Sequence, residues 1–131
     1  MAVCPQNFGL TQSLVSPPID PAPHIIDASA EWDEGTGNGT ITLTFDKDMM
    51  TDADRGQILS MVDKDNSEES CAPIEWTTPR IWQGTTPTLY NYQAPYTAKY
   101  VASENEAYRF KSADGHYLAD FTGLPVPINW L

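Results

Sequence analysis

Gly39-Thr40-Ile41-Thr42-Leu43-Thr44-Phe45-Asp46 alternates apolar side chains and threonines without interruption. Ile41, Leu43 and Phe45 fall on one side of an extended chain and the threonines on the other, which is the period-2 pattern of a half-buried strand. The Asn38-Gly39 pair at its start is a strong signal for a tight turn. We therefore expect a strand over residues 40–46, with Phe45 in the core.

Strand-like runs and turn signals continue on both sides of this segment. The run before it predicts a first strand whose inward side chains are Ile26, Ala28, Ala30 and Trp32. Near the end of the chain, Asp114-Gly115 predicts the turn of a hairpin. Further short strands are expected near 57–62, 73–76, 79–83, 88–92, 107–111, 117–121 and 125–130. About seven to nine strands, with a turn roughly every 8–12 residues, predict an all-β sandwich over residues 24–131.

Size and charge limit the classes of function. A chain of 131 residues suits a single domain with one core. Seven basic against 18 acidic residues give a net charge of −11, which argues against nucleic acid and anionic membranes as partners, because cationic side chains bind both. No signal peptide is recognisable, and no apolar run approaches the roughly 18 residues that span a bilayer. We therefore expect synthesis and retention in the cytoplasm until assembly or lysis.

Residues 1–23 differ in composition from the rest of the chain. They hold five of the eleven prolines, no lysine or arginine, and one acidic residue, Asp20. Proline excludes a helix here and favours an extended, polyproline-like arm. Because the arm is also apolar, it suits binding to a neighbouring surface; wrapping around its own domain is the alternative. The residues expected to contact a partner are Phe8, Leu10, Leu14, Val15, Pro17, Pro18 and Ile19.

The arm needs more than side-chain burial to become ordered. Its few apolar side chains do not offset the conformational entropy of ordering about 20 residues, even though proline reduces that cost. We therefore expect the arm to gain order by pairing with an edge strand, or through many copies that act together.

A family resemblance is carried by four stretches, Pro23–Ala30, Thr40–Met49, Ala113–Phe121 and Val126–Asn129. In these stretches the chain resembles the bacterial Ig-like domains of cell-surface proteins and of tailed-phage structural proteins. His116 stands where asparagine is common in the family, and residues 55–105 depart from its pattern. The resemblance covers roughly residues 23–131. It implies an Ig-like β-sandwich with an extended N-terminal arm, and it implies no catalytic residues.

Two acidic loops are candidates for calcium binding. Residues 63–69 carry carboxylates at alternate positions but lack the glycine expected at the sixth position, and Ile74 occupies the twelfth. The second group consists of Asp46, Asp48, Asp52 and Asp54. We expect both loops to be solvated, without a bound metal or cofactor. Cys4 and Cys71 have the option of forming a disulfide, although two free thiols suit a chain made in a reducing compartment.

The sequence carries no motif for catalysis. A Gly-x-Ser-x-Gly elbow and a phosphate-binding glycine loop are absent, and His24 and His116 fall in a junction and a turn. We therefore expect a protein that is not an enzyme. Aromatic residues are more suggestive of binding. Most belong to the core, and those expected to form an exposed partner-binding patch are Trp82, Tyr96 and Tyr100.

These features favour a structural protein of a phage virion, in the form of a capsid decoration protein on the particle surface. A single Ig-like module without a signal peptide carries an apolar arm suited to capsid subunits, and its acidic body suits a soluble particle surface. The expected partner is the major capsid protein or another virion protein, with homo-oligomerisation on the particle as an option. The alternatives are a tail, baseplate or head-fibre component, and a carbohydrate-binding or adhesion module.

Overall fold

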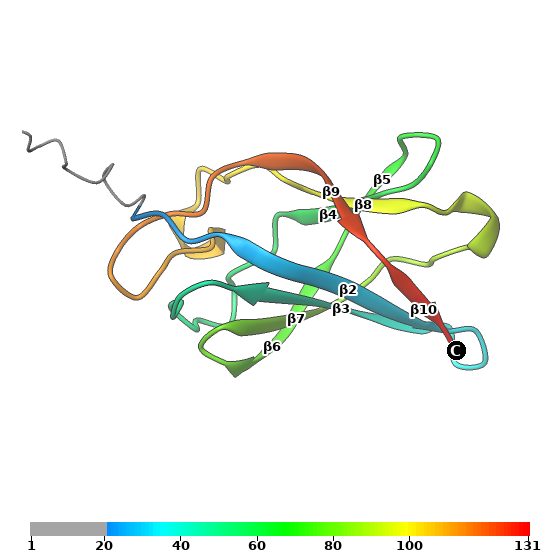
Figure 1. Cartoon of the computed structure of the whole chain (residues 1–131), viewed down its shortest axis with the longest axis horizontal. Helices are drawn as coiled ribbons and strands as arrows, with labels where there is room; N and C mark the ends of the chain where they lie inside the picture. Colours follow the sequence, from blue (N-terminus) through cyan, green and yellow to red (C-terminus); the bar gives the residue numbers. More distant parts are fainter. Residues whose placement is uncertain (1–20) are drawn as a thin grey trace, which may run out of the picture.

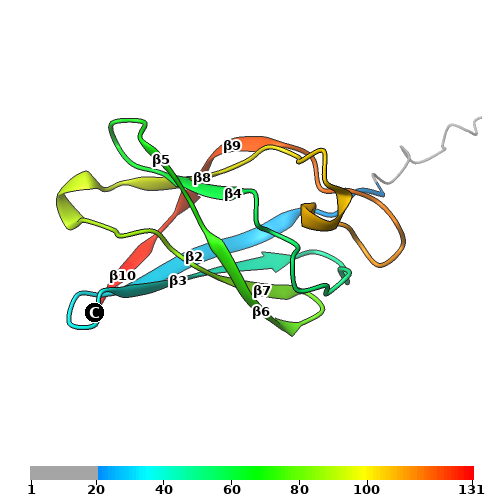
Figure 2. The ribbon, with the colours of Figure 1, turned by 180° about the vertical axis from the view of Figure 1, so that it is seen from behind.

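A computed structural model describes residues 21–131, which fold into two packed β-sheets (Figures 1 and 2). The regular elements in this range are nine strands and two short 3-10 turns. The all-β sandwich expected from the sequence is thereby confirmed. Residues 1–20 lie outside this range, and so do the contacts expected of Phe8, Leu10, Leu14, Val15, Pro17, Pro18 and Ile19.

The first sheet has five strands in the order β10-β2-β3-β7-β6. Its members are β2 (Ile25–Asp33), β3 (Asn38–Phe45), β6 (Ala72–Thr78), β7 (Ile81–Thr85) and β10 (Ile128–Trp130). Neighbouring strands are antiparallel except β10 and β2, which run parallel with Ile128 opposite Ala30. The end of the chain thus pairs with the first strand of the described region.

The second sheet has four antiparallel strands in the order β5-β4-β8-β9. Its members are β4 (Leu59–Val62), β5 (Glu68–Ser70), β8 (Tyr96–Tyr100) and β9 (Phe121–Val126). Only Pro127 separates β9 from β10. At this residue the chain passes from the second sheet to the first, along the red segment in Figure 1.

The strand order is that of an immunoglobulin-type sandwich. Strands β2, β3, β7 and β6 take positions A, B, E and D, and they face β5, β4, β8 and β9 in positions C′, C, F and G. Tyr96, the first residue of β8, forms the tyrosine corner typical of such folds. Its hydroxyl accepts a hydrogen bond from the Tyr90 N–H (2.8 Å) and donates one to the Tyr90 carbonyl (3.3 Å). This pair of bonds fixes the turn that precedes β8.

The core between the sheets contains the strand predicted most clearly by the sequence. Ile41, Leu43 and Phe45 are fully buried, which confirms the strand over residues 40–46. A buried phenylalanine from the long loop between β8 and β9, Phe110, completes this core. Its ring centroid lies 5.2–5.5 Å from those of three other aromatic rings, Phe45, Trp82 and Tyr100. Aromatic packing across the sandwich therefore holds the long loop in place.

The expectation that Ile26 points inward is wrong. Ile26 is 65 % exposed, whereas the other three expected inward side chains of β2 are buried. The pairing of β2 with β3 shifts register between Ile25 and Asp27. Because a shift of one residue reverses the face on which a side chain lies, Ile25 packs against the core instead.

Three expected strands are replaced by turns or bridges. Residues 88–92 lead into the 3-10 turn η1 (Asn91–Gln93), and residues 107–111 overlap the 3-10 turn η2 (Glu106–Tyr108). Residues 117–121 form only an isolated bridge from Tyr117 to Lys111 before β9 begins. The structure instead forms β5 and β8, which were not expected. The Phe110 N–H donates to the Tyr100 hydroxyl at 3.0 Å. A side chain therefore accepts the hydrogen bond that the carbonyl of a neighbouring strand was expected to accept.

Candidate partner-binding groove

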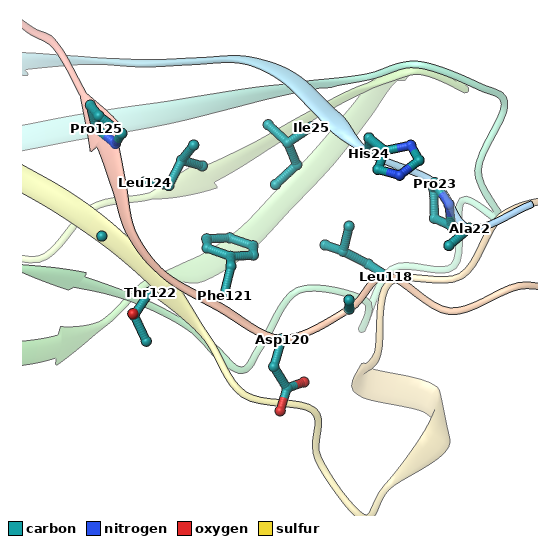
Figure 3. Close-up of a pocket in the computed structure, with 12 residues that line it drawn as sticks. Ala22, Pro23, His24, Ile25, Leu118, Asp120, Phe121, Thr122, Leu124 and Pro125 are labelled. Atoms are coloured by element: carbon teal, nitrogen blue, oxygen red, sulfur yellow. The ribbon is translucent and has the colours of Figure 1, made fainter. Parts of the chain in front are cut away.

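An apolar groove lies between the start of β2 and the segment that leads through β9. Its main part has a volume of about 480 Å³, and an adjoining hollow of about 290 Å³ extends it along β2 to Ala28. The apolar lining of the main part includes Pro23, Ile25, Leu118, Phe121, Leu124 and Pro125. Figure 3 shows Ile25, Leu118 and Phe121 pointing toward one another, while Asp120 points away. We call the two hollows together the β2–β9 groove.

Both walls of the groove are sheet edges. β10 pairs with β2 only at residues 30–32, so the earlier half of β2, residues 25–29, has no strand beside it on that side within the described chain. β9 is the last strand of the second sheet. An exposed strand edge presents backbone groups that can pair with an added strand. The groove therefore combines an apolar floor with unpaired backbone.

The local sequence explains why the sandwich is open here. Pro125 and Pro127 lack a backbone N–H, and Gly123 has a φ of 72°. Proline and a residue with positive φ both interrupt a continuous ladder, so β9 cannot pair with β2 along its length. Pairing with β2 begins at Pro127, whose carbonyl accepts a hydrogen bond from the Ala30 N–H at 2.9 Å.

Residues 21–24, which lead from the arm into β2, are anchored at one end of the groove. The Lys47 ammonium donates to the Pro21 carbonyl at 2.7 Å and to the Asp114 carboxylate at 3.0 Å. Asp46 accepts from the His24 N–H at 2.9 Å, and its other oxygen lies 2.8 Å from the His24 ring Nδ1. Partial desolvation raises the pKa of Asp46, but the hydrogen bonds from His24 outweigh it and leave the pKa below its ordinary value. These contacts fix the position from which the arm departs.

The exposed aromatic patch expected from the sequence is a wrong prediction. Trp82 and Tyr100 are fully buried, and Tyr96 is only 6 % exposed. Each of them is also held by a hydrogen bond to the backbone; for Trp82 the indole N–H donates to the Arg55 carbonyl at 3.0 Å. The side chains therefore belong to the core and to the tyrosine corner. They therefore do not form an exposed patch for a partner.

Among residues 21–131, no three His, Cys, Asp or Glu side chains gather in a way that could hold a metal ion. In the group formed by Asp46, Asp48, Asp52 and Asp54, two carboxylates are paired with cations instead: Asp48 with Arg80 (2.9 Å) and Asp52 with Arg55 (2.8 Å). In the loop of residues 63–69, Asp63 caps its own turn by accepting from two backbone N–H groups. These partners explain why neither acidic loop converges on a cation.

The two cysteines are in different situations. Cys71 is a free thiol in the core, and burial raises its pKa to about 12. Cys4 lies outside the described residues, so the Cys4–Cys71 disulfide considered from the sequence lies outside them too. In the described chain, Cys71 acts as a small core residue.

The residues of the β2–β9 groove were not selected from the sequence. One signal for them was present: Ile25 and Ile26 are consecutive apolar residues, which breaks the alternation of the first strand. The prolines at 125 and 127 were a second signal, since proline within a strand is confined to sheet edges and bulges. Together they mark the two edges that form the groove.

No protein-family model and no curated protein sequence matches this chain. Within residues 21–131, no helix is long and apolar enough to cross a membrane. The functional inference therefore rests on the groove, on the anchored residues beside it and on the composition of the arm.

Proposed function

We propose that this chain is a non-enzymatic structural protein of a phage virion. It acts as a capsid decoration protein that attaches to the assembled shell through its N-terminal arm and through the sandwich edge at the β2–β9 groove. Its partner is the major capsid protein or another virion protein. Each copy adds a modest contact, and the many copies on one particle together reinforce the shell.

The observation that supports this proposal most is the position of the β2–β9 groove at the base of the arm. The groove is lined from Ala22 onward, directly after the apolar arm in the sequence, and Lys47 and Asp46 anchor residues 21–24 beside it. Edge pairing of this kind is a common mode of protein attachment. It suits a protein whose function is to bind other proteins permanently.

Charge supports the same assignment. The net charge of −11 keeps a densely covered particle surface soluble and discourages binding to the packaged nucleic acid. The apolar arm carries no lysine or arginine. Attachment would thus depend on the arm and groove, while the acidic body faces water.

Co-sedimentation with particles of the encoding phage that lack the protein tests this proposal. The full chain should sediment with the particles, and Leu14→Asp in the arm should reduce the bound fraction strongly, because a buried carboxylate is costly. A matched control is Ile74→Asp, which changes a half-exposed isoleucine on β6, at the far edge of the first sheet. Failure of the unmodified chain to bind any particle would contradict the proposal.

A specific observation also supports the carbohydrate-binding alternative, at a different place from the one first expected. Tyr90 and Tyr92 are 45 % and 69 % exposed, with ring centroids 5.3 Å apart. Tyr90 borders a polar hollow of about 210 Å³ that is also lined by Asp63 and Glu69. Exposed aromatic rings beside carboxylates suit a sugar. Glycan-array binding that is lost on Tyr92→Ala would favour this function, and absence of binding would remove its support.

A further inference from the structure

We propose that the β2–β9 groove of each copy binds residues 8–15 from the arm of a second copy, as a strand added to the free half of β2. This inference rests on the proposed structural role and narrows it: the groove and residues 8–15 join neighbouring copies, which leaves residues 1–7 of the arm to contact the shell. Copies would then be linked to one another on the particle, arm to groove.

The free half of β2 offers both backbone and side-chain contacts to an added strand. Because alternate residues of a strand direct their backbone groups to the same side, the N–H and C=O of Ala28 face the same way as those of Ala30, whose N–H bonds to Pro127. β10 begins too late along β2 to cover Ala28. An added strand would therefore continue the line of β10 and lie over the apolar floor.

The arm has a segment with the pattern that this position requires. In an extended conformation, one face would carry three large apolar side chains and one polar one, Phe8, Leu10, Gln12 and Leu14, and the other face would carry the smaller residues Gly9, Thr11, Ser13 and Val15. Residues 25–29 of β2 span roughly 17 Å at about 3.3 Å per residue, and the eight residues of the segment span roughly 26 Å. The segment is thus long enough to cover the whole free edge.

The residues between this segment and β2 favour a second copy over the chain's own groove. Four of the seven residues from 16 to 22 precede a proline, a sequence pattern that disfavours helical backbone and favours extended backbone before each proline. At about 3.1 Å per residue, an extended stretch of this length would carry residue 15 roughly 20 Å from β2. Lys47 and Asp46 hold the base of the stretch. A return into the chain's own groove would need a reversal that these prolines oppose.

The geometry of such a contact determines the kind of assembly. The arm of one copy and the groove of the next are different surfaces, so the contact is head-to-tail and forms rings or open chains. An assembled shell presents regularly spaced sites, and these would decide at which copy a ring closes. Free in solution, the protein should associate in a concentration-dependent way.

Two variants of the full-length chain test the inference by light scattering after gel filtration. The arm variant combines Phe8→Asp with Leu10→Asp. The groove variant is Ile26→Asp. Ile26 lines the hollow that extends the groove along β2, and because it is 65 % exposed the fold should tolerate the change. Ile74→Asp, 51 % exposed on β6, is the matched control. Circular dichroism of all four proteins verifies that each is folded.

The unmodified chain and the Ile74→Asp control should associate equally, whereas each of the other variants alone should self-associate roughly tenfold more weakly or worse. Mixing the arm variant with the groove variant should restore one contact, because the intact arm of one meets the intact groove of the other. The expected product is a heterodimer of two 14.5 kDa chains. Monomers in every sample, or a mixture that stays monomeric, would overturn the inference in favour of the chain's own arm or another protein as occupant.

This experiment separates the inference from the proposed function, since it needs no virion. Self-association without binding to particles would uphold the inference and contradict the decoration role. If the chain binds particles but stays monomeric in the mixing experiment, the decoration role would be upheld and the inference contradicted.

Discussion

Replacing Trp82 with phenylalanine should lower the free energy of unfolding by about 2.5–4.5 kcal/mol. The indole N–H donates to the Arg55 carbonyl in the core, so the variant leaves a buried acceptor unpaired at a cost of about 1–3 kcal/mol. The smaller ring also removes two buried carbons, at about 0.8 kcal/mol each. Gly56 and Gly84 lie against the indole so closely that any side chain there would overlap it. These two neighbours therefore have no side chain that could fill the space left by the smaller ring.

Guanidinium unfolding monitored by circular dichroism measures this change, and Tyr92→Ala is the control. Tyr92 is 69 % exposed, so its loss should change the free energy of unfolding by less than about 0.5 kcal/mol. A loss below about 1 kcal/mol for Trp82→Phe would refute the buried position of the indole and restore Trp82 as a candidate for partner binding.

Three further predictions concern stability and reactivity. Arg55→Met should destabilise the protein by about 2–4 kcal/mol in the same assay. The buried guanidinium of Arg55 donates to the carbonyl of Arg109 at 2.7 Å and to the carboxylate of Asp52 at 2.8 Å, and the variant loses both bonds. A change below about 0.5 kcal/mol would contradict this role. With a thiol-specific reagent at pH 8, Cys71 should react only on unfolding, since it is buried and its pKa is raised to about 12; rapid reaction of Cys71 in the folded protein, located by peptide mapping, would contradict its burial. Hydrogen bonds from Ser112 to Asp114 and from Tyr117 to Glu106 lower the pKa of both carboxyl groups. Their contribution to stability is present above the unfolded-state values and is lost as the pH falls through the folded-state values, so the melting temperature should fall between about pH 5 and pH 3. Asp114→Asn should weaken that fall, and an unchanged pH profile would contradict the assignment.

The sequence predicted the sandwich where the pattern is local. The alternation over residues 40–46 depends only on which face of one strand is buried, and Ile41, Leu43 and Phe45 lie where it placed them. The same reasoning placed Ile26 on the wrong face, because the register shift beside it depends on pairing with β3. A period-2 pattern carries no signal for a bulge that begins within it.

The groove and the aromatic core depend on contacts between residues far apart in the sequence. Trp82 is buried because Phe110, from a loop 28 positions further along, packs edge-on against it at 5.3 Å. The groove exists because β10 joins β2 only after Pro127. The composition showed that the chain is rich in aromatic residues. It did not show which of them the fold buries and which it leaves exposed. The arm, in contrast, was recognisable from its prolines and apolar residues alone.

The most direct test of the central claim is the copy number of this chain in purified virions of the phage that encodes it. Quantitative mass spectrometry would give its ratio to the major capsid protein. The decoration role predicts a ratio near one or a simple fraction of one, and so tens to hundreds of copies per particle. A handful of copies would assign the chain to the tail or a fibre, and its absence from the particle would contradict a structural role in the virion.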